Sequence, residues 1–191
     1  MSENFTTNFV GEQWRQWQQH LAPFIGKECR GLEIGSWEGR SAIWFLDTVL
    51  THSASRLVCV DTWRAGSGGL PLFTDDTLLD RFFSNLGPER LARVEAIRAE
   101  SSEALPKLVA AGVRFDWFYV DGSHRCADVL RDSVACWDLA NPGAVIIWDD
   151  HGWMVEPNDR PGPAIDAFLS CFAGRYEVLQ KAYQVIVRVV K

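Results

Sequence analysis

Residues 114–150 decide the fold, and they read RFDWFYVDGSHRCADVLRDSVACWDLANPGAVIIWDD. Two apolar runs, FYV at 118–120 and VIIW at 145–148, lie on either side of a helical pattern over 124–140. Strands of a parallel sheet that is covered on both faces have such continuous apolar runs. A strand, a helix and a second strand in this order predict a right-handed crossover between two parallel strands.

The same alternation continues in both directions along the chain. We expect strands at 30–35, 56–61, 93–99, 114–121, 143–148, 176–183 and 184–190. We expect helices at 11–25, 38–50, 75–86, 101–112, 124–140 and 164–174, with Ser101 as an N-cap, and breaks at Gly87-Pro88 and at Asn141-Pro142-Gly143. This pattern predicts an α/β fold: a doubly wound, Rossmann-like, seven-stranded and mostly parallel sheet with a C-terminal β-hairpin.

The length and composition fit one globular domain. The chain has 191 residues, of which 47% are hydrophobic and 23% are charged, enough for a sizeable core. The net charge of −6 and the mixing of arginines with acids argue against a nucleic-acid partner. No stretch approaches the roughly 20 apolar residues of a membrane span, so we expect a cytoplasmic protein without a membrane partner. Five cysteines without CxxC spacing are expected to be reduced core thiols.

Polar residues stand where the predicted strands end. They are Glu33 and Gly35, Asp61, Asp121, and the pair Asp149-Asp150. In open α/β sheets ligands bind beyond these carboxyl ends, so the side chains are expected to converge if the fourth strand lies beside the first. The loop EIGSWEGRS lacks GxGxxG, which weakens one alternative, a nicotinamide-dependent oxidoreductase. A non-catalytic cofactor-binding protein is the other alternative.

Five motifs occur in a specific order: LEIGSWEGRSA (32–42), VDTW (60–63), AESSEALPKL (99–108), FYVDGSH (118–124) and IIWDD (146–150). Together they resemble the class I S-adenosylmethionine-dependent methyltransferases. Within that class the chain is most similar to the metal-dependent small-molecule O-methyltransferases. These include the catechol and caffeoyl-coenzyme A type and the group of macrocin O-methyltransferase and cephalosporin-hydroxylase-like proteins. The resemblance covers roughly residues 28–170 and implies a methyltransferase domain at 28–191 after an N-terminal helical extension at 1–27.

The resemblance implies S-adenosyl-L-methionine as cofactor and assigns residues to it. Those expected around its methionine end are Glu33, Gly35, Ser36, Trp37, Gly39 and Ser41, with Asp121 nearby. Asp61 is expected to hold the ribose diol, and Thr62 and Trp63 to flank the adenosine. Ser101 and Ser102 are expected at the adenine edge.

The resemblance also implies a Mg²⁺ or other divalent cation bound by Asp121, Asp149 and Asp150. Such a cation prefers oxygen ligands and lowers the pKa of a bound hydroxyl, and a nearby histidine takes the proton near neutral pH. His124 stands where the catechol-type enzymes have a lysine base, so His124 and Asp121 are the catalytic candidates. Successive strand residues point to opposite faces, so Asp149 and Asp150 can share a cation only if the chain leaves extended geometry there.

The expected partner is a small hydroxylated molecule, such as a sugar, a phenol or another secondary metabolite. Its contacts are expected from the N-terminal helix and from the loops 64–75 and 152–163, the least patterned parts of the chain. An oligomer is compatible with the sequence but has no signature in it.

Overall fold

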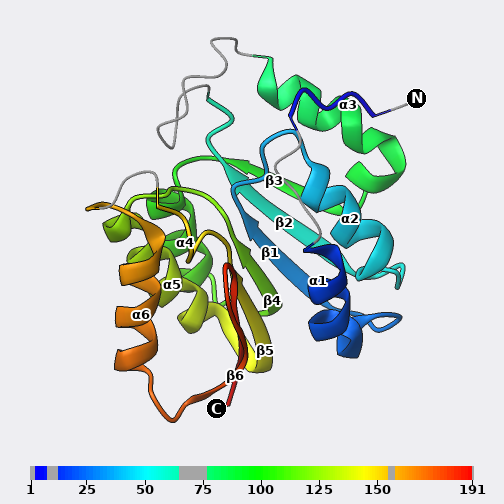
Figure 1. The fold of residues 1–191 in the computed structure, drawn as a ribbon. Helices are drawn as coiled ribbons and strands as arrows, with labels where there is room; N and C mark the ends of the chain where they lie inside the picture. The colour runs from blue at the N-terminus through cyan, green and yellow to red at the C-terminus, as the bar shows by residue number, and fades with distance from the viewer. Residues whose placement is uncertain (1–2, 8–12, 65–76, 155–157, 191) are drawn as a thin grey trace.

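A single seven-stranded sheet organises the chain (Figure 1). The computed structural model describes residues 3–7, 13–64, 77–154 and 158–190. The strand order is β3-β2-β1-β4-β5-β7-β6. The strands are β1 (Arg30–Ile34), β2 (Arg56–Asp61), β3 (Val94–Arg98), β4 (Phe115–Val120), β5 (Ala140–Trp148), β6 (Tyr176–Lys181) and β7 (Val185–Val189). Strands β1 to β5 pair in parallel and β7 pairs antiparallel with β5 and β6, which confirms the predicted fold.

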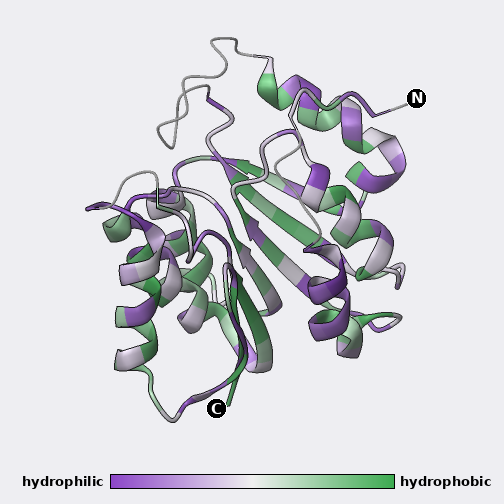
Figure 2. Ribbon diagram, viewed as in Figure 1, coloured by the Kyte–Doolittle hydropathy of each residue, from purple (hydrophilic) through white to green (hydrophobic). Residues whose placement is uncertain are grey.

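Helices cover both faces of the sheet (Figure 1). One layer has α1 (Trp14–Leu21), the 3-10 turn η1 (Ala22–Phe24), α2 (Arg40–Thr48) and α3 (Leu78–Leu91); the other has α4 (Ser101–Ala110), α5 (Cys126–Leu139) and α6 (Pro161–Cys171). Alternate residues of β4 enter the two cores, Trp117 and Tyr119 on the first side and Phe118 on the second. Figure 2 shows the resulting apolar strands between helices with polar outer faces.

Two predicted boundaries on the second face were wrong. β5 begins at Ala140, opposite Phe115 of β4, so the expected turn at 141–143 lies inside the strand, before a register shift. Helix α6 begins at Pro161 rather than 164. Proline is favoured in the first helical turn because backbone N–H groups there have no intrahelical acceptor, so the absence of an N–H in proline costs no hydrogen bond.

Two further expectations concerned helix ends. Ser101 is the first helical residue of α4 rather than its N-cap, which is Glu100. The predicted break at Gly87 is confirmed, since Gly87 has φ of 68°. A further turn from Pro88 to Leu91 follows this kink, and the expected helix start at 75–76 lies outside the described residues.

The N-terminal helix is part of the core. Helix α1 is shorter than the predicted 11–25, of which 11–12 lie outside the described residues. Its Trp17 is fully buried and stacks on Phe45 with ring centroids 5.0 Å apart. The proposed division at residues 27 and 28 stays a prediction. No helix in the described part of the chain has the length and apolar character that crossing a membrane requires.

Only some of the cysteines are core residues. Cys29, Cys59 and Cys136 are buried as expected, whereas Cys126 is half-buried and Cys171 is exposed. All five are free thiols, so the fold depends on packing rather than on cross-links.

Candidate active site

The predicted polar residues meet at the carboxyl edge of the sheet. The backbone N–H of Asp121 donates to the Ile34 carbonyl (2.8 Å) and that of Asp149 to the Val120 carbonyl (3.0 Å). Among the described residues, the non-glycine residues with left-handed φ are Trp37 (48°), Trp63 (44°) and Asp150 (59°). All three follow the carboxyl ends of strands, and such backbone strain clusters at functional sites.

The glycine loop, residues 35–39, is fastened to β2 by Asp61. One carboxylate oxygen of Asp61 accepts the backbone N–H groups of Ser36 (2.8 Å) and Trp37 (2.9 Å). The other oxygen accepts the N–H of Trp63 at 2.6 Å. A carboxylate has about four acceptor positions, so Asp61 retains capacity for one more donor. It therefore shapes the loop and keeps one acceptor position, and its predicted contact with a ribose stays a prediction.

Glu33 of β1 also supports the glycine loop. Its side chain is fully buried and accepts hydrogen bonds from the hydroxyls of Ser36 (2.6 Å) and Ser41 (2.5 Å). The Cys59 thiol donates to it at 3.5 Å. Burial raises the pKa of Glu33 to about 7, against the opposing effect of the serine hydroxyls. Glu33 thus links the loop to α2, and since its pKa is about 7, a nearby cation would favour its ionised form.

Trp63 also has a structural position. Its ring is fully buried against Phe82 (centroids 4.9 Å apart), and its indole N–H donates to the Trp37 carbonyl at 3.0 Å. Buried in this way, Trp63 holds the loop rather than presenting a free face to a ligand. Thr62 and Ser101 are half-buried and Ser102 is exposed, and their predicted contacts with the cofactor stay predictions.

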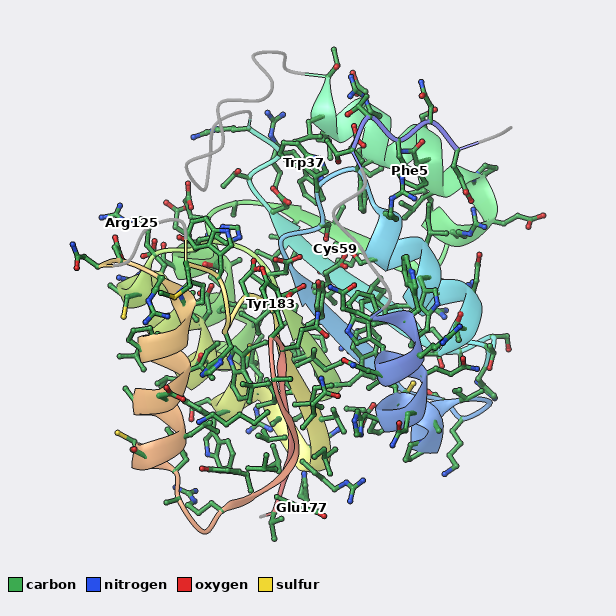
Figure 3. The ribbon with its side chains drawn as sticks, in the orientation of Figure 1. Phe5, Trp37, Cys59, Arg125, Glu177 and Tyr183 are labelled. Carbon is green, nitrogen blue, oxygen red and sulfur yellow. The ribbon has the colours of Figure 1, made fainter. Side chains whose placement is uncertain are left out.

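An N-terminal strap, residues 3–7, lies across the glycine loop, a contact that the sequence analysis missed. Glu38 accepts the backbone N–H (2.8 Å) and the hydroxyl (2.5 Å) of Thr6, as well as the Arg81 guanidinium at 2.8 Å. The Trp37 indole donates to the Thr7 hydroxyl at 3.2 Å. Figure 3 shows Phe5 of the strap near Trp37. No local sequence pattern predicts contacts between residues about 30 positions apart.

Tyr119 lies between two carboxylates. Its hydroxyl is 2.9 Å from Oδ2 of Asp121 and 2.5 Å from Oδ2 of Asp149. One hydroxyl hydrogen cannot fully serve two acceptors. Burial, then the charges of Asp149 and Asp150, raise the pKa of Asp121 well above its ordinary value. Tyr119 was missed as well, although its position two residues before Asp121 places both on one face of the strand.

Asp150 turns away from Asp149 and binds a histidine. Its Oδ2 is 2.7 Å from Nε2 of His124, and its Oδ1 accepts the Tyr183 hydroxyl at 2.6 Å. Because a carboxylate only accepts, Nε2 carries a hydrogen, and in the neutral imidazole Nδ1 is then the acceptor nitrogen. Nδ1 is buried and has no hydrogen-bond partner within the described part of the chain. The Trp153 ring lies 4.8 Å from the imidazole. This arrangement suits a proton acceptor.

The donor set fits a divalent cation. Ligand atoms of Asp121, His124 and Asp150 all lie within 4.8 Å of one another. The left-handed φ of Asp150 supplies the departure from extended geometry that the sequence analysis required. Asp149 is not in this group; its oxygens accept from Tyr119 and from the Asp150 N–H (2.8 Å). The structure therefore assembles two of the three predicted aspartates, with His124 beside them.

Comparisons with known proteins identify the family and the fold of the chain. The model of a family described as "Methyltransferase domain" matches residues 32–151, more than half of the chain. No curated protein matches. Similar solved structures include the O-methyltransferase TomG of Streptomyces achromogenes, involved in tomaymycin synthesis, in complex with S-adenosylmethionine. TomG shares 22% identity over 93% of this chain and 80% of its own, with a TM-score of 0.69.

Two other solved structures are informative. The O-methyltransferase of Bacillus cereus, in complex with S-adenosylhomocysteine, has 20% identity over 98% of this chain and 84% of its own, with a TM-score of 0.68. MycE of the mycinamycin pathway, in complex with Mg, S-adenosylhomocysteine and mycinamycin VI, has 16% identity and a TM-score of 0.69. That match covers 97% of this chain and 51% of MycE. At these identities the similarity establishes a shared fold.

Proposed function

This chain belongs to the methyltransferase domain family, and from that premise we propose that it transfers a methyl group from S-adenosylmethionine to a hydroxyl oxygen of a small molecule. One observation carries the proposal: His124, oriented by Asp150 and with Nδ1 unpaired among the described residues, stands beside the Asp121 carboxylate at the carboxyl edge of the sheet. A hydroxyl must lose its proton to accept a methyl group, and this pair is placed to take it.

The cofactor would lie on the glycine loop. Asp61 would receive the ribose hydroxyls with its remaining acceptor capacity, while it fixes the N–H groups of Ser36 and Trp37. Glu33 would pair in its ionised form with the positively charged methionine ammonium. Its pKa is about 7, so a nearby positive charge suffices to displace its proton near neutral pH. TomG and the Bacillus cereus enzyme, whose structures hold this cofactor or its product, support the choice over a nicotinamide.

Asp121 and Asp150 would hold a divalent cation, which prefers oxygen ligands of this kind. When bound, the cation would lower the pKa of the acceptor hydroxyl. His124 would receive the proton on Nδ1, and Asp150 would keep the imidazole in the required tautomer. Asp149 would position Tyr119 and the backbone of Asp150. The magnesium in the MycE structure supports this assignment.

Titration calorimetry with S-adenosylhomocysteine tests the proposal. We expect binding to the wild type, and Asp61→Ala to weaken it by about 1.5–3 kcal/mol, as for a hydrogen bond to a charged group. Asp116→Ala is a matched control, because Asp116 accepts the Arg30 N–H (2.8 Å) at the opposite edge of the sheet. It should leave cofactor binding unchanged. Tight NAD binding without S-adenosylhomocysteine binding would reject the assignment.

A further inference from the structure

A polar cleft opens between α1 and the turn of the β6–β7 hairpin. Its volume is about 360 Å³, within the range of small-molecule pockets. The described residues that line it are Gln13, Arg15, Gln16, Gln180, Ala182, Tyr183 and Gln184. Four of these seven residues carry a neutral carboxamide, and only Arg15 is charged. Such a lining is rich in both hydrogen-bond donors and acceptors.

Two of the carboxamides have buried atoms with unused hydrogen-bonding capacity in the described structure: Oε1 of Gln13 and Nε2 of Gln184. The orientation of Gln184 is fixed, because the Trp17 indole, which can only donate, bonds its Oε1 at 2.9 Å. Gln184 is 1% exposed, and a hydrogen bond from its amide nitrogen opposes the rise in the pKa of the Asp149 carboxyl. An amide nitrogen has two hydrogens, so one remains for a ligand. Gln13 Oε1 has no partner at all among the described residues, and because buried polar atoms are seldom left unpaired, this acceptor indicates a missing partner.

The cleft adjoins the candidate active site. The hairpin turn lies at the carboxyl edge of the sheet, because Val185 of β7 pairs with Trp148, the last residue of β5. Tyr183 lines the cleft and donates its hydroxyl to Asp150; Figure 3 shows it at the end of the hairpin. Trp17, which holds Gln184, lies 4.8 Å from the Tyr119 ring. A molecule bound in the cleft would therefore reach toward Asp150 past Tyr183.

We infer that this cleft is the acceptor subsite and that it binds a neutral, hydroxyl-rich group such as a pyranose ring. The inference rests on the proposed methyltransferase function and adds the chemical class of the substrate. A hydroxyl both donates and accepts, so hydroxyls of one ring can donate to Gln13 Oε1 and accept from Gln184 Nε2. A carboxylate only accepts and leaves Gln13 unpaired. An unsubstituted aromatic ring satisfies neither atom.

Saturation-transfer NMR on the full chain, loaded with S-adenosylhomocysteine, tests the inference with methyl α-glucopyranoside as the probe and benzoate and toluene as comparisons. We expect the glycoside alone to bind. Gln13→Met removes the unpaired acceptor, and Gln184→Glu removes the donor but keeps an acceptor for Trp17. Each should raise the dissociation constant of the glycoside about tenfold. Gln19→Met, on the exposed side of α1, is the matched control and should leave it unchanged.

The experiments distinguish a failure of the proposed function from a failure of the inference about the cleft. If S-adenosylhomocysteine does not bind the wild type in calorimetry, the proposed function fails and the inference falls with it. If S-adenosylhomocysteine binds but the glycoside does not, the inference alone is overturned. The same holds if the glycoside binds equally well to Gln13→Met and Gln184→Glu, or if benzoate or toluene binds at least as tightly as the glycoside. Thermal melting of each variant confirms that a loss of binding is not a loss of folding.

Discussion

Gly35 packs directly against the backbone of Asp121: a β-carbon added to Gly35 would overlap the Asp121 carbonyl oxygen and carbon. Gly35 also has φ of 85°, which a side chain disfavours. The contact joins the glycine loop after β1 to the acidic group after β4. The cofactor side and the acidic side of the candidate site are therefore adjacent because Gly35 has no side chain.

Gly35→Ala is accordingly expected to lower the free energy of unfolding by roughly 2–5 kcal/mol, from steric overlap plus the left-handed conformation. Urea denaturation measures this, and calorimetry should show weaker S-adenosylhomocysteine binding. Gly26→Ala is the control, because Gly26 has φ of 75° but nothing within 4 Å of an added β-carbon. It should cost only about 1–2 kcal/mol. Equal losses at the two sites would show that the Asp121 contact is unimportant.

His124→Gln should lower kcat by about 10²–10⁴-fold, because glutamine can keep a hydrogen bond to Asp150 but cannot accept a proton at this pH. Steady-state kinetics and calorimetry measure this, and S-adenosylhomocysteine binding should be retained. Added imidazole should restore part of the rate. His52→Gln, at a histidine between α2 and the start of β2, at the edge of the sheet opposite the site, should have normal kinetics. An unchanged rate in His124→Gln would assign the proton transfer to another group.

Mg²⁺ or Mn²⁺ should raise the melting temperature. A bound cation offsets the repulsion that, after burial, raises the pKa of Asp121. At a hundredfold excess over the dissociation constant, linkage predicts about 2.7 kcal/mol of stabilisation. Asp121→Asn should abolish the increase, whereas Asp138→Asn, on the exposed side of α5, should keep it. The increase should persist in His124→Gln, and its loss there would make His124 a ligand rather than a base.

The stability of the cofactor-free protein should fall between pH 5 and pH 8 because of Glu33. Its pKa is about 7 in the folded protein against 4.5 for the ordinary side chain, so the folded state binds its proton more tightly. This contribution is fully present below pH 4.5 and is lost as the pH rises through 7, a change of roughly 3 kcal/mol.

Chemical denaturation across this pH range should give a flatter profile for Glu33→Gln than for the wild type, because glutamine does not titrate. Glu95→Gln, at an exposed position on β3, should reproduce the wild-type profile. Parallel profiles for the wild type and Glu33→Gln would show that Glu33 is already ionised when buried.

The sequence alone determined the class of sheet, its strands and the residues at their carboxyl ends, whereas the structure decided that the fourth strand lies beside the first. Continuous apolar runs such as 145–148 and helical patterns with a period of 3.6 residues such as 124–140 are local and can be counted along the chain. Parallel strands then place Asp61, Asp121 and Asp149 at one edge whatever the details of their packing.

Only the tertiary structure decided which of these side chains face one another. The left-handed turn at Asp150 directs it to His124 and leaves Asp149 with Tyr119. Trp63, expected beside adenosine, is buried under the glycine loop. The strap contact between Thr6 and Glu38 and the amide of Gln184 beside Trp17 join segments 32 and 167 residues apart. Such contacts depend on how the packed layers fill space, and no periodicity along the chain records that.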